Sequence, residues 1–357
     1  MTAHSNNWTA SERITVEQAA LDDASIDTWV MAHPRSTPFH RPAWVRAVAE
    51  GTGQTPLMLV ARDASGKIVG LLPLTLIRSL LFGKALVSTG FSVDGGILAD
   101  DPAVADALAA ACWALAERHG CTTAELRGGM LPGLGWSVKN DTYLNFSKPL
   151  AADDAAQLAA VPRKHRAELR KGLDNGLTVE IGRSEKLRAL HYSLYARSVH
   201  RLGTPVFPCA LFENTLDAMG NDANIILISN NNDPVTATLS LYHNGTCMPY
   251  WQGSSDAARS LRSNEVAYFH LMNHARNRGC HTFDFGRSKV GTGPAAWKKS
   301  WGWEGVPLSY AVRSAEGQDA RDVNPLSPQY RRKVELWKKL PLGIANLLGP
   351  HIARGLG

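Results

Sequence analysis

Residues 283–303, FDFGRSKVGTGPAAWKKSWGW, place cations and aromatic side chains around a glycine-rich segment. The stretch begins as an apolar strand at Phe283 and Phe285, and residues 286–293 are expected to follow as an open loop. The loop and the wall after it carry cations and tryptophans: Arg287, Lys289, Trp297, Lys298, Lys299 and Trp301. Cations beside a flexible loop can neutralise a pyrophosphate or another anionic group. This stretch is therefore the candidate binding site.

An earlier segment has the same pattern without the cations. Residues 116–128, AERHGCTTAELRG, align without gaps with residues 275–287, ARNRGCHTFDFGR. The identical pairs are Ala116/Ala275, Gly120/Gly279, Cys121/Cys280 and Thr123/Thr282. Each segment follows a helix-like stretch (106–118 and 264–278) and, before it, strands opened by a turn at Gly66-Lys67 or Asn232-Asp233. This order predicts two copies of one α/β unit, with strands 122–126 and 281–285 in equivalent positions.

Length and composition agree with two domains. The chain has 357 residues, of which 44% are hydrophobic, enough to bury two cores. We expect a first unit over residues 1–150, a second over 151–312 and a tail over 313–357. The first residues contain no apolar signal region, and the five scattered cysteines form no CxxC pair, so the sequence predicts a cytoplasmic protein with reduced thiols.

Charge is concentrated in the second half. Residues 1–150 hold 12 Lys and Arg against 14 Asp and Glu, whereas residues 151–357 hold 26 against 18. Such an excess favours an anionic partner, although each cluster can equally be a solvated face. Arg163, Arg166 and Arg170 have helical spacing and can bind phosphate from one face, or lie on an exposed linking helix. Asn264 opens a helix whose free N–H groups can hold an anion.

The C-terminal tail has the pattern of a basic amphipathic helix. Tyr330, Val334 and Trp337 share one face among the cations of residues 331–339. Such a helix can lie peripherally on the inner face of a membrane with the three apolar side chains inserted. The alternative is a C-terminal helix that packs on its own domain.

Several chemistries have no motif in this chain. GxxxxGK[ST], GxSxG and HExxH are all absent, and the 12 histidines lack metal-ligand spacing, so no metal is expected. No DNA partner is predicted. RNA, including tRNA, is compatible with the basic half, although no base-stacking motif supports it.

Longer segments resemble a known family. The segments that carry the similarity are LLPLTLIRSLLFGKALVS, DGGIL, RLGTPVF, FDFGRSKVGTG and WKKSWGW, and the tail pieces NPLSPQYR, LWKKLPL and NLLGP. Through these segments the chain is similar to FemAB-like proteins associated with exosortase (PEP-CTERM) and exopolysaccharide systems. The resemblance implies two tandem GNAT units of mixed α/β fold and acyltransferase activity. Members that act on peptidoglycan transfer an amino acid from aminoacyl-tRNA to an amine on a lipid-linked precursor.

The resemblance also suggests site residues. The family block FKxxFG corresponds to residues 297–302, which assigns its substrate-contacting lysine to Lys298. Residues 259–265 replace the (Q/R)xxGxG/A loop of CoA-using relatives without its glycines, and the coiled-coil arm of some tRNA-using relatives has no counterpart. The co-substrate, acyl-CoA or aminoacyl-tRNA, therefore stays open, and no tightly bound cofactor is expected. We expect Lys298→Ala to abolish function with little loss of stability.

Amine acylation requires a proton acceptor and a held acceptor molecule. Asp284 is a candidate base, or an acid that fixes Arg287 or a helix end. Tyr250 and Trp251 are candidates for the acceptor site, or core aromatics. The sequence thus predicts an N-acyl or aminoacyl transferase acting on a small-molecule or lipid-linked saccharide acceptor of the envelope or exopolysaccharide. The alternative is a noncatalytic glycolipid-binding assembly factor of the same system.

Overall fold

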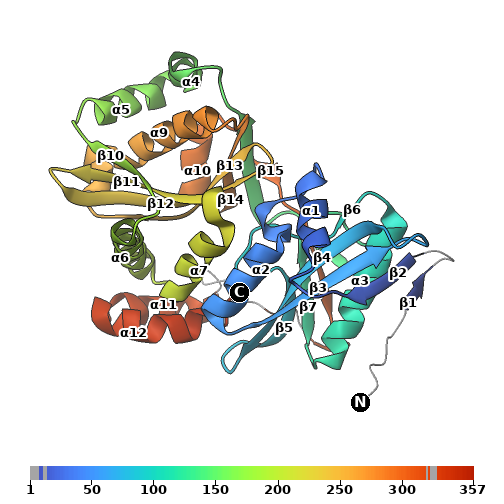
Figure 1. Ribbon diagram of the computed structural model, residues 1–357. Coiled ribbons are helices and arrows are strands. Elements are labelled where there is room, and N and C mark those ends of the chain that lie inside the picture. Colours follow the sequence, from blue (N-terminus) through green and yellow to red (C-terminus); the bar gives the residue numbers. More distant parts are fainter. Residues whose placement is uncertain (1–7, 11–13, 319–320, 322–327) are drawn as a thin grey trace. The chain divides into compact units, whose positions relative to one another are not determined.

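The computed structural model describes residues 8–10, 14–318, 321 and 328–357. The chain forms two compact units (Figure 1). Unit 1 comprises residues 1–140, 309–323 and 352–357, and unit 2 comprises residues 141–308 and 324–351. The division differs from the expected one at both boundaries. Residues 141–150 belong to unit 2, and the first residues assigned to the tail, 313–318, belong to unit 1.

Unit 1 is a mixed sheet with helices on both faces. Its strands lie in the order β1-β2-β3-β4-β5-β7-β16-β8, and β6 pairs with β4. Their bounds are β1 Trp8–Ala10, β2 Ile14–Gln18, β3 Thr55–Arg62, β4 Ile68–Ser79, β5 Gly83–Ser88, β6 Leu98–Ala99, β7 Thr123–Arg127, β8 Ser137–Lys139 and β16 Tyr310–Ser314. The helices are α1 Ala24–Ala32, the 3-10 turn Pro38–His40, α2 Pro42–Thr52 and α3 Pro102–Arg118.

Strand β3 shows why both faces of this sheet are covered. Leu57 and Leu59 join the core that α3 completes, whereas Met58 and Val60 join the core formed with α1 and α2. Successive side chains of a strand point to opposite faces, so a continuous apolar run needs a helix layer on each side.

Unit 2 repeats this arrangement. Its strands lie in the order β10-β11-β12-β13-β14-β9-β15. Their bounds are β9 Tyr143–Pro149, β10 Thr178–Gly182, β11 Ala223–Asn230, β12 Asp233–His243, β13 Thr246–Ser254, β14 Thr282–Lys289 and β15 Val306–Pro307. The helices are α4 Asp154–Ala160, α5 Arg163–Leu173, α6 Glu185–Leu202, α7 Cys209–Met219, the 3-10 turn Gly220–Asp222, α8 Ala258–Leu261, α9 Ser263–Asn277, α10 Gly293–Ser300, α11 Pro328–Lys338 and α12 Leu342–Ala353. Helix α9 covers one face of the sheet and α6 the other (Figure 1).

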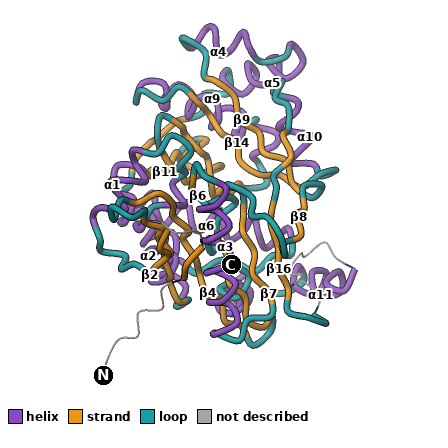
Figure 2. Tube along the Cα trace, turned by 90° about the vertical axis from the view of Figure 1, so that its right-hand side faces the viewer, coloured by secondary structure: helices purple, strands orange, loops and turns teal. Residues whose placement is uncertain are grey.

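The two sheets have equivalent topology, which confirms the predicted duplication. In each, a helix (α3 or α9) leads into a strand that pairs in parallel with an earlier one: β7 with β5, and β14 with β13. The next neighbour is antiparallel and comes from a distant part of the chain, β16 beside β7 and β9 beside β14 (Figure 2). Strands 122–126 and 281–285 therefore occupy the same position in their sheets, as expected. These distant neighbours also explain why the unit boundaries do not follow the sequence.

The aligned residues of the two copies form a shared helix end. Gly120 and Gly279 have left-handed φ angles of 64° and 83°. The next N–H groups, of Cys121 and Cys280, donate to the carbonyls of Ala116 and Ala275 at 2.9 and 3.0 Å. Glycine followed by this hydrogen bond back into the last turn is a common helix C-terminus. The repeated sequence thus records where a helix stops and the parallel strand begins.

Candidate active site

The central strands of unit 2 diverge. β13 and β14 pair only at Thr246↔Thr282 and Cys247↔Phe283, although β13 continues to Ser254 and β14 to Lys289. In unit 1, the parallel pair β5 and β7 stays in register over all four pairs that end at Ser88↔Leu126, where β5 itself ends. Beyond Cys247 the facing edges of β13 and β14 are therefore not paired with each other, although β13 still pairs with β12 and β14 with β9.

A β-bulge follows the divergence in each strand. The register of β13 on β12 shifts so that Tyr250 is the extra residue, and the register of β14 on β9 shifts so that Phe285 is the extra residue. Bulges bend a strand and leave one residue outside the ladder, and they are frequent beside active sites. Gly286, next to the second bulge, has a left-handed φ of 70°.

A polar network lies at the amino end of α9, next to these strands. The Tyr268 hydroxyl donates to Gln252 Oε1 at 2.8 Å, and Gln252 Nε2 donates to Asn264 Oδ1, also at 2.8 Å. The hydroxyl of Thr236 on β12 donates to the same Asn264 oxygen at 3.1 Å. Thr238, which pairs with Gln252, has a buried hydroxyl without a partner among the described residues. This face of the sheet is therefore polar where β13 leaves β14.

The first turn of α9 is the anion site predicted from the sequence. Arg262 precedes the helix in a left-handed conformation with φ 55°, and no side chain caps the turn. The first N–H groups of a helix have no partner within the helix, so they can bind the phosphates of either expected donor. The Arg262 side chain is held away by Glu168 Oε2 at 2.6 Å. Residues 259–265 replace the glycine-containing loop of the CoA-using relatives. Within them, Arg262 adopts a left-handed backbone conformation that glycine favours.

Lys298 is buried instead of lying on an open loop. Its side chain is 7% exposed, and Nζ donates to the carbonyls of Gly286 at 2.8 Å and Arg287 at 3.1 Å. Burial lowers the pKa of Lys298 to about 8, against the opposing effect of Asp284. Burial raises the pKa of Asp284, whose carboxylate accepts from Gly286 N–H at 2.7 Å and Asn145 Nδ2 at 3.2 Å. Both groups therefore hold the bulge of β14.

The aromatic wall is a packed cluster between α9, α10 and β14. Tyr268 lies 5.0 Å from Phe285 and 5.1 Å from Trp297 between ring centroids, and Trp297 lies 5.7 Å from Trp301. Trp297 Nε1 donates to Glu265 Oε1 at 3.1 Å, which links α10 to the first turn of α9. Trp301 is 1% exposed, and its Nε1 has no partner in the described part of the chain.

The open loop expected over residues 286–293 is wrong for residues 286–289, which continue β14 and pair with residues 143–146 of β9. Only residues 290–292 connect β14 to helix α10, which carries Trp297 and Lys298. Arg287 lies 4.3 Å above the Tyr143 ring, and Lys289 pairs with the same tyrosine. The bulge and the left-handed Gly286 let a segment with loop-like composition remain in the sheet.

The remaining predicted residues are not all brought together. Asn264 joins the polar network, and the bulged Tyr250 packs 4.9 Å from Trp251. Trp251 is buried and packs 4.6 Å from Phe212 of α7, away from the α9 cluster. The predicted arginines, Arg163, Arg166 and Arg170, lie on α5, where Arg166 donates to the Ala159 carbonyl.

Sequence reasoning missed the roles of Gln252, Tyr268, Thr236 and Glu265. The sequence does show hydrogen-bonding side chains at these positions in otherwise apolar segments. It does not show that these side chains contact one another in the folded protein. Among the described residues, no cluster of His, Cys, Asp and Glu could hold a metal ion, and no helix is long and apolar enough to span a membrane.

Comparison with known proteins agrees with this geometry. Residues 160–299, most of unit 2, match the family described as acetyltransferase (GNAT) domain. The crystal structure of FemX is similar at 16% identity and TM-score 0.66, covering 83% of this chain and 96% of its own. A tandem GNAT protein from the clavulanic acid biosynthesis pathway is similar at 14% identity and TM-score 0.56, covering 86% and 100%. N-myristoyltransferase of Saccharomyces cerevisiae, solved with bound myristoyl-CoA, is similar at 10% identity and TM-score 0.51, covering 92% and 90%.

A search of curated proteins gave no sequence match. The solved structures show the tandem GNAT fold, as the resemblance implied. The matched acetyltransferase (GNAT) domain supports an acyltransferase.

Proposed function

We propose that unit 2 transfers an acyl or aminoacyl group to an amine of a cell-envelope or exopolysaccharide precursor, including lipid-linked ones. The observation that carries this proposal is the divergence of β13 and β14 beside the uncapped first turn of α9. Unpaired backbone N–H groups can stabilise the oxyanion of acyl transfer, by about 3 to 4 kcal/mol per donor in other enzymes. The corresponding strands of unit 1, β5 and β7, stay paired to the end of β5, so we assign the reaction to unit 2.

The α9 side of unit 2 supplies the donor site in this proposal. The first turn of α9, with Asn264, would hold phosphates of acyl-CoA or of the aminoacyl-tRNA end. Arg163 and Arg170 on α5 are exposed and add positive charge on a helix packed against α9. The other residues proposed to contact the substrates, or to position groups that do, are Arg287, Lys289, Tyr250, Trp297 and Trp301.

Lys298 is the proposed general base. A neutral lysine amine has two hydrogens, which match the two carbonyl acceptors at Gly286 and Arg287, and its lone pair is then free to accept the proton of the attacking amine. A lysine pKa near 8 gives a usable fraction of neutral amine close to neutral pH. Asp284 would position the bulge and tune this amine.

The envelope and exosortase-linked setting comes from the resemblance of the sequence to FemAB-like proteins. FemX, whose fold this chain shares, supports that direction at the level of fold only. The noncatalytic assembly factor is the competing outcome of the same experiments.

The test compares glycolipids and polysaccharide precursors of the source strain with those of a deletion strain by mass spectrometry. We expect a species with an added acyl or aminoacyl mass to disappear on deletion, to return with the wild-type gene and with Lys299→Met, and to stay absent with Lys298→Met. Calorimetry with acetyl-CoA and with charged tRNA then identifies the donor class. An unchanged set of acylated species in the deletion strain, with a precursor still bound by the purified protein, would refute the transferase and favour the assembly factor.

A further inference from the structure

The C-terminal helices differ from the amphipathic insertion surface expected from sequence. Val334 of α11 packs against Gly203 at the end of α6, where an added Cβ would lie only 2.5 Å from Val334 and 3.1 Å from Lys338. Trp337 is half-buried, and Tyr330 lies outside the residues whose side chains are described. The face predicted to insert is therefore the packed face of α11, as far as the described residues show.

A different apolar surface is exposed on α12. Ile344, Leu347 and Leu348 have exposed fractions of 46%, 70% and 45%, and their spacing places them on one face of the helix. The opposite face is anchored, because Ala345 is 2% exposed and Gly349 lies against Val206. We call Ile344, Leu347 and Leu348 the α12 ridge. Its exposure is not a result of fraying, since the helix is fixed from its other side.

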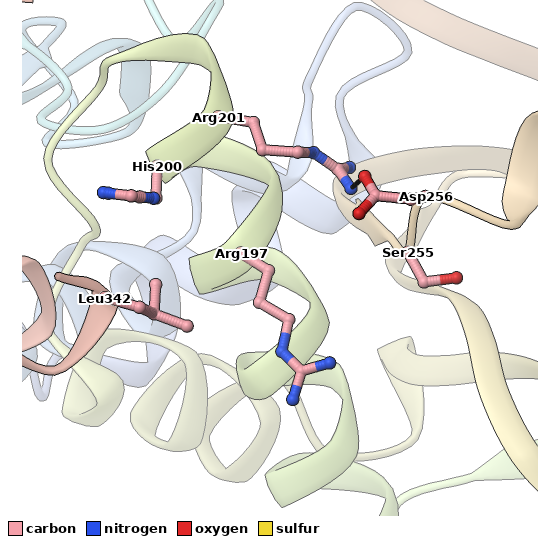
Figure 3. Close-up of a pocket in the computed structure, with 6 residues that line it drawn as sticks. All are labelled: Arg197, His200, Arg201, Ser255, Asp256 and Leu342. Atoms are coloured by element: carbon pink, nitrogen blue, oxygen red, sulfur yellow. Dashed lines mark hydrogen bonds and ion pairs between the residues drawn. The ribbon is translucent and has the colours of Figure 1, made fainter. Parts of the chain in front are cut away.

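The segment that leads into α12 and forms it is basic, because residues 336–357 contain Lys338, Lys339 and Arg354 and no Asp or Glu. Lys339, just after α11, lines a surface pocket with Arg332, Glu335 and Leu336 of that helix. At the start of α12, Leu342 lines a pocket with Arg197, Arg201 and Asp256 (Figure 3). Arg201 pairs with Asp256, whereas the exposed Arg197 guanidinium has no ion-pair partner among the described residues.

We propose that the α12 ridge, with Arg197 and Lys339, docks this protein on an anionic lipid bilayer. Exposed leucines on a fixed helix can enter the region between head groups and acyl chains, and nearby cations attract the negative surface. The absence of acidic residues after Glu335 favours an anionic bilayer over a neutral one. This docking does not depend on transferase activity.

Vesicle flotation of the full-length protein tests the proposal. Wild type should float with vesicles of equal phosphatidylcholine and phosphatidylglycerol, and much less with phosphatidylcholine alone. Leu347→Ser with Leu348→Ser should weaken binding at least about tenfold, since each leucine loses apolar burial. Arg197→Gln with Lys339→Gln should weaken it about fivefold per cation. Leu134→Ser, at a fully exposed leucine of unit 1, is the matched control and should bind as wild type.

Thermal melts of every variant confirm that folding is retained, and Leu347→Ser alone replaces the double variant if that one is unstable. Equal flotation of wild type with both vesicle types would overturn the choice of an anionic bilayer, as would unchanged binding of the Arg197 and Lys339 variant. Wild-type flotation of the ridge variant, or an equal loss with Leu134→Ser, would overturn the assignment to the α12 ridge.

Discussion

The buried ammonium group of Lys298 makes the stability of unit 2 depend on pH. The pKa of Lys298 is about 8 in the folded protein, below the ordinary value of 10.5. Below pH 8 the folded protein carries the full unfavourable free energy of the buried charge. Between about pH 8 and 10.5 the unfolded chain binds more protons than the folded one, so the free energy of unfolding rises with pH. At about 1.4 kcal/mol per pKa unit, the rise is on the order of 3 kcal/mol.

Lys298→Met removes this dependence. At neutral pH the variant loses two hydrogen bonds to backbone carbonyls, worth about 1.5 to 3 kcal/mol each when the donor is charged, but it also removes the buried charge. The two lost bonds sum to about 3 to 6 kcal/mol, against about 3 kcal/mol for the buried charge, so near neutral pH the variant should lie between unchanged stability and a loss of about 3 kcal/mol. Towards about pH 10 the wild type should gain on the order of 3 kcal/mol over the variant.

Urea unfolding across this pH range measures the difference directly. Tyrosines and cysteines that titrate in the same range are shared by both proteins and cancel in the comparison. Lys299→Met, at the exposed neighbouring lysine, should follow the wild-type pH dependence. Parallel curves for wild type and Lys298→Met would show that the ammonium is not buried in solution and would remove the basis for Lys298 as a base with a lowered pKa.

Two glycine substitutions test the packing that positions the site. Gly253→Ala should destabilise the protein by about 3 kcal/mol or more in urea unfolding, because the new Cβ would lie 2.2 Å from the Tyr195 backbone nitrogen of α6; a near-neutral result would contradict the observed approach of α6 to β13. Gly286→Ala has open space but a φ of 70°, so it should lower stability by about 1 to 2 kcal/mol, whereas Gly293→Ala, with open space and no left-handed φ, should be close to neutral. Equal effects of Gly286→Ala and Gly293→Ala would mean that the left-handed conformation of Gly286 is not required for the stability of the protein.

Local sequence determined where elements start and stop. The Gly-Cys pairs after α3 and α9 end their helices through the same backbone hydrogen bond, and Asn231 and Asn232 supply the left-handed turn between β11 and β12. These signals act over a few residues, because they depend on φ preferences and on hydrogen bonds within one turn. The order of elements, read twice along the chain, was then enough to predict two equivalent α/β units.

Tertiary structure decided which edges and faces meet. The sequences of β9 and β16 do not predict that β9 pairs with β14 and β16 with β7, because the edge of an antiparallel strand can pair with many partners. The burial of Lys298 was also decided by tertiary structure, because it depends on carbonyl groups beside the bulge of β14. Likewise, Gln252, Asn264 and Tyr268 form hydrogen bonds only because β13 and α9 pack together in the fold. Residue type and helical spacing identified amphipathic segments in the tail, but only packing against α6 determined that Val334 faces inward. Long-range contacts fix burial, and burial decides whether a lysine is a surface charge or a group with an altered pKa.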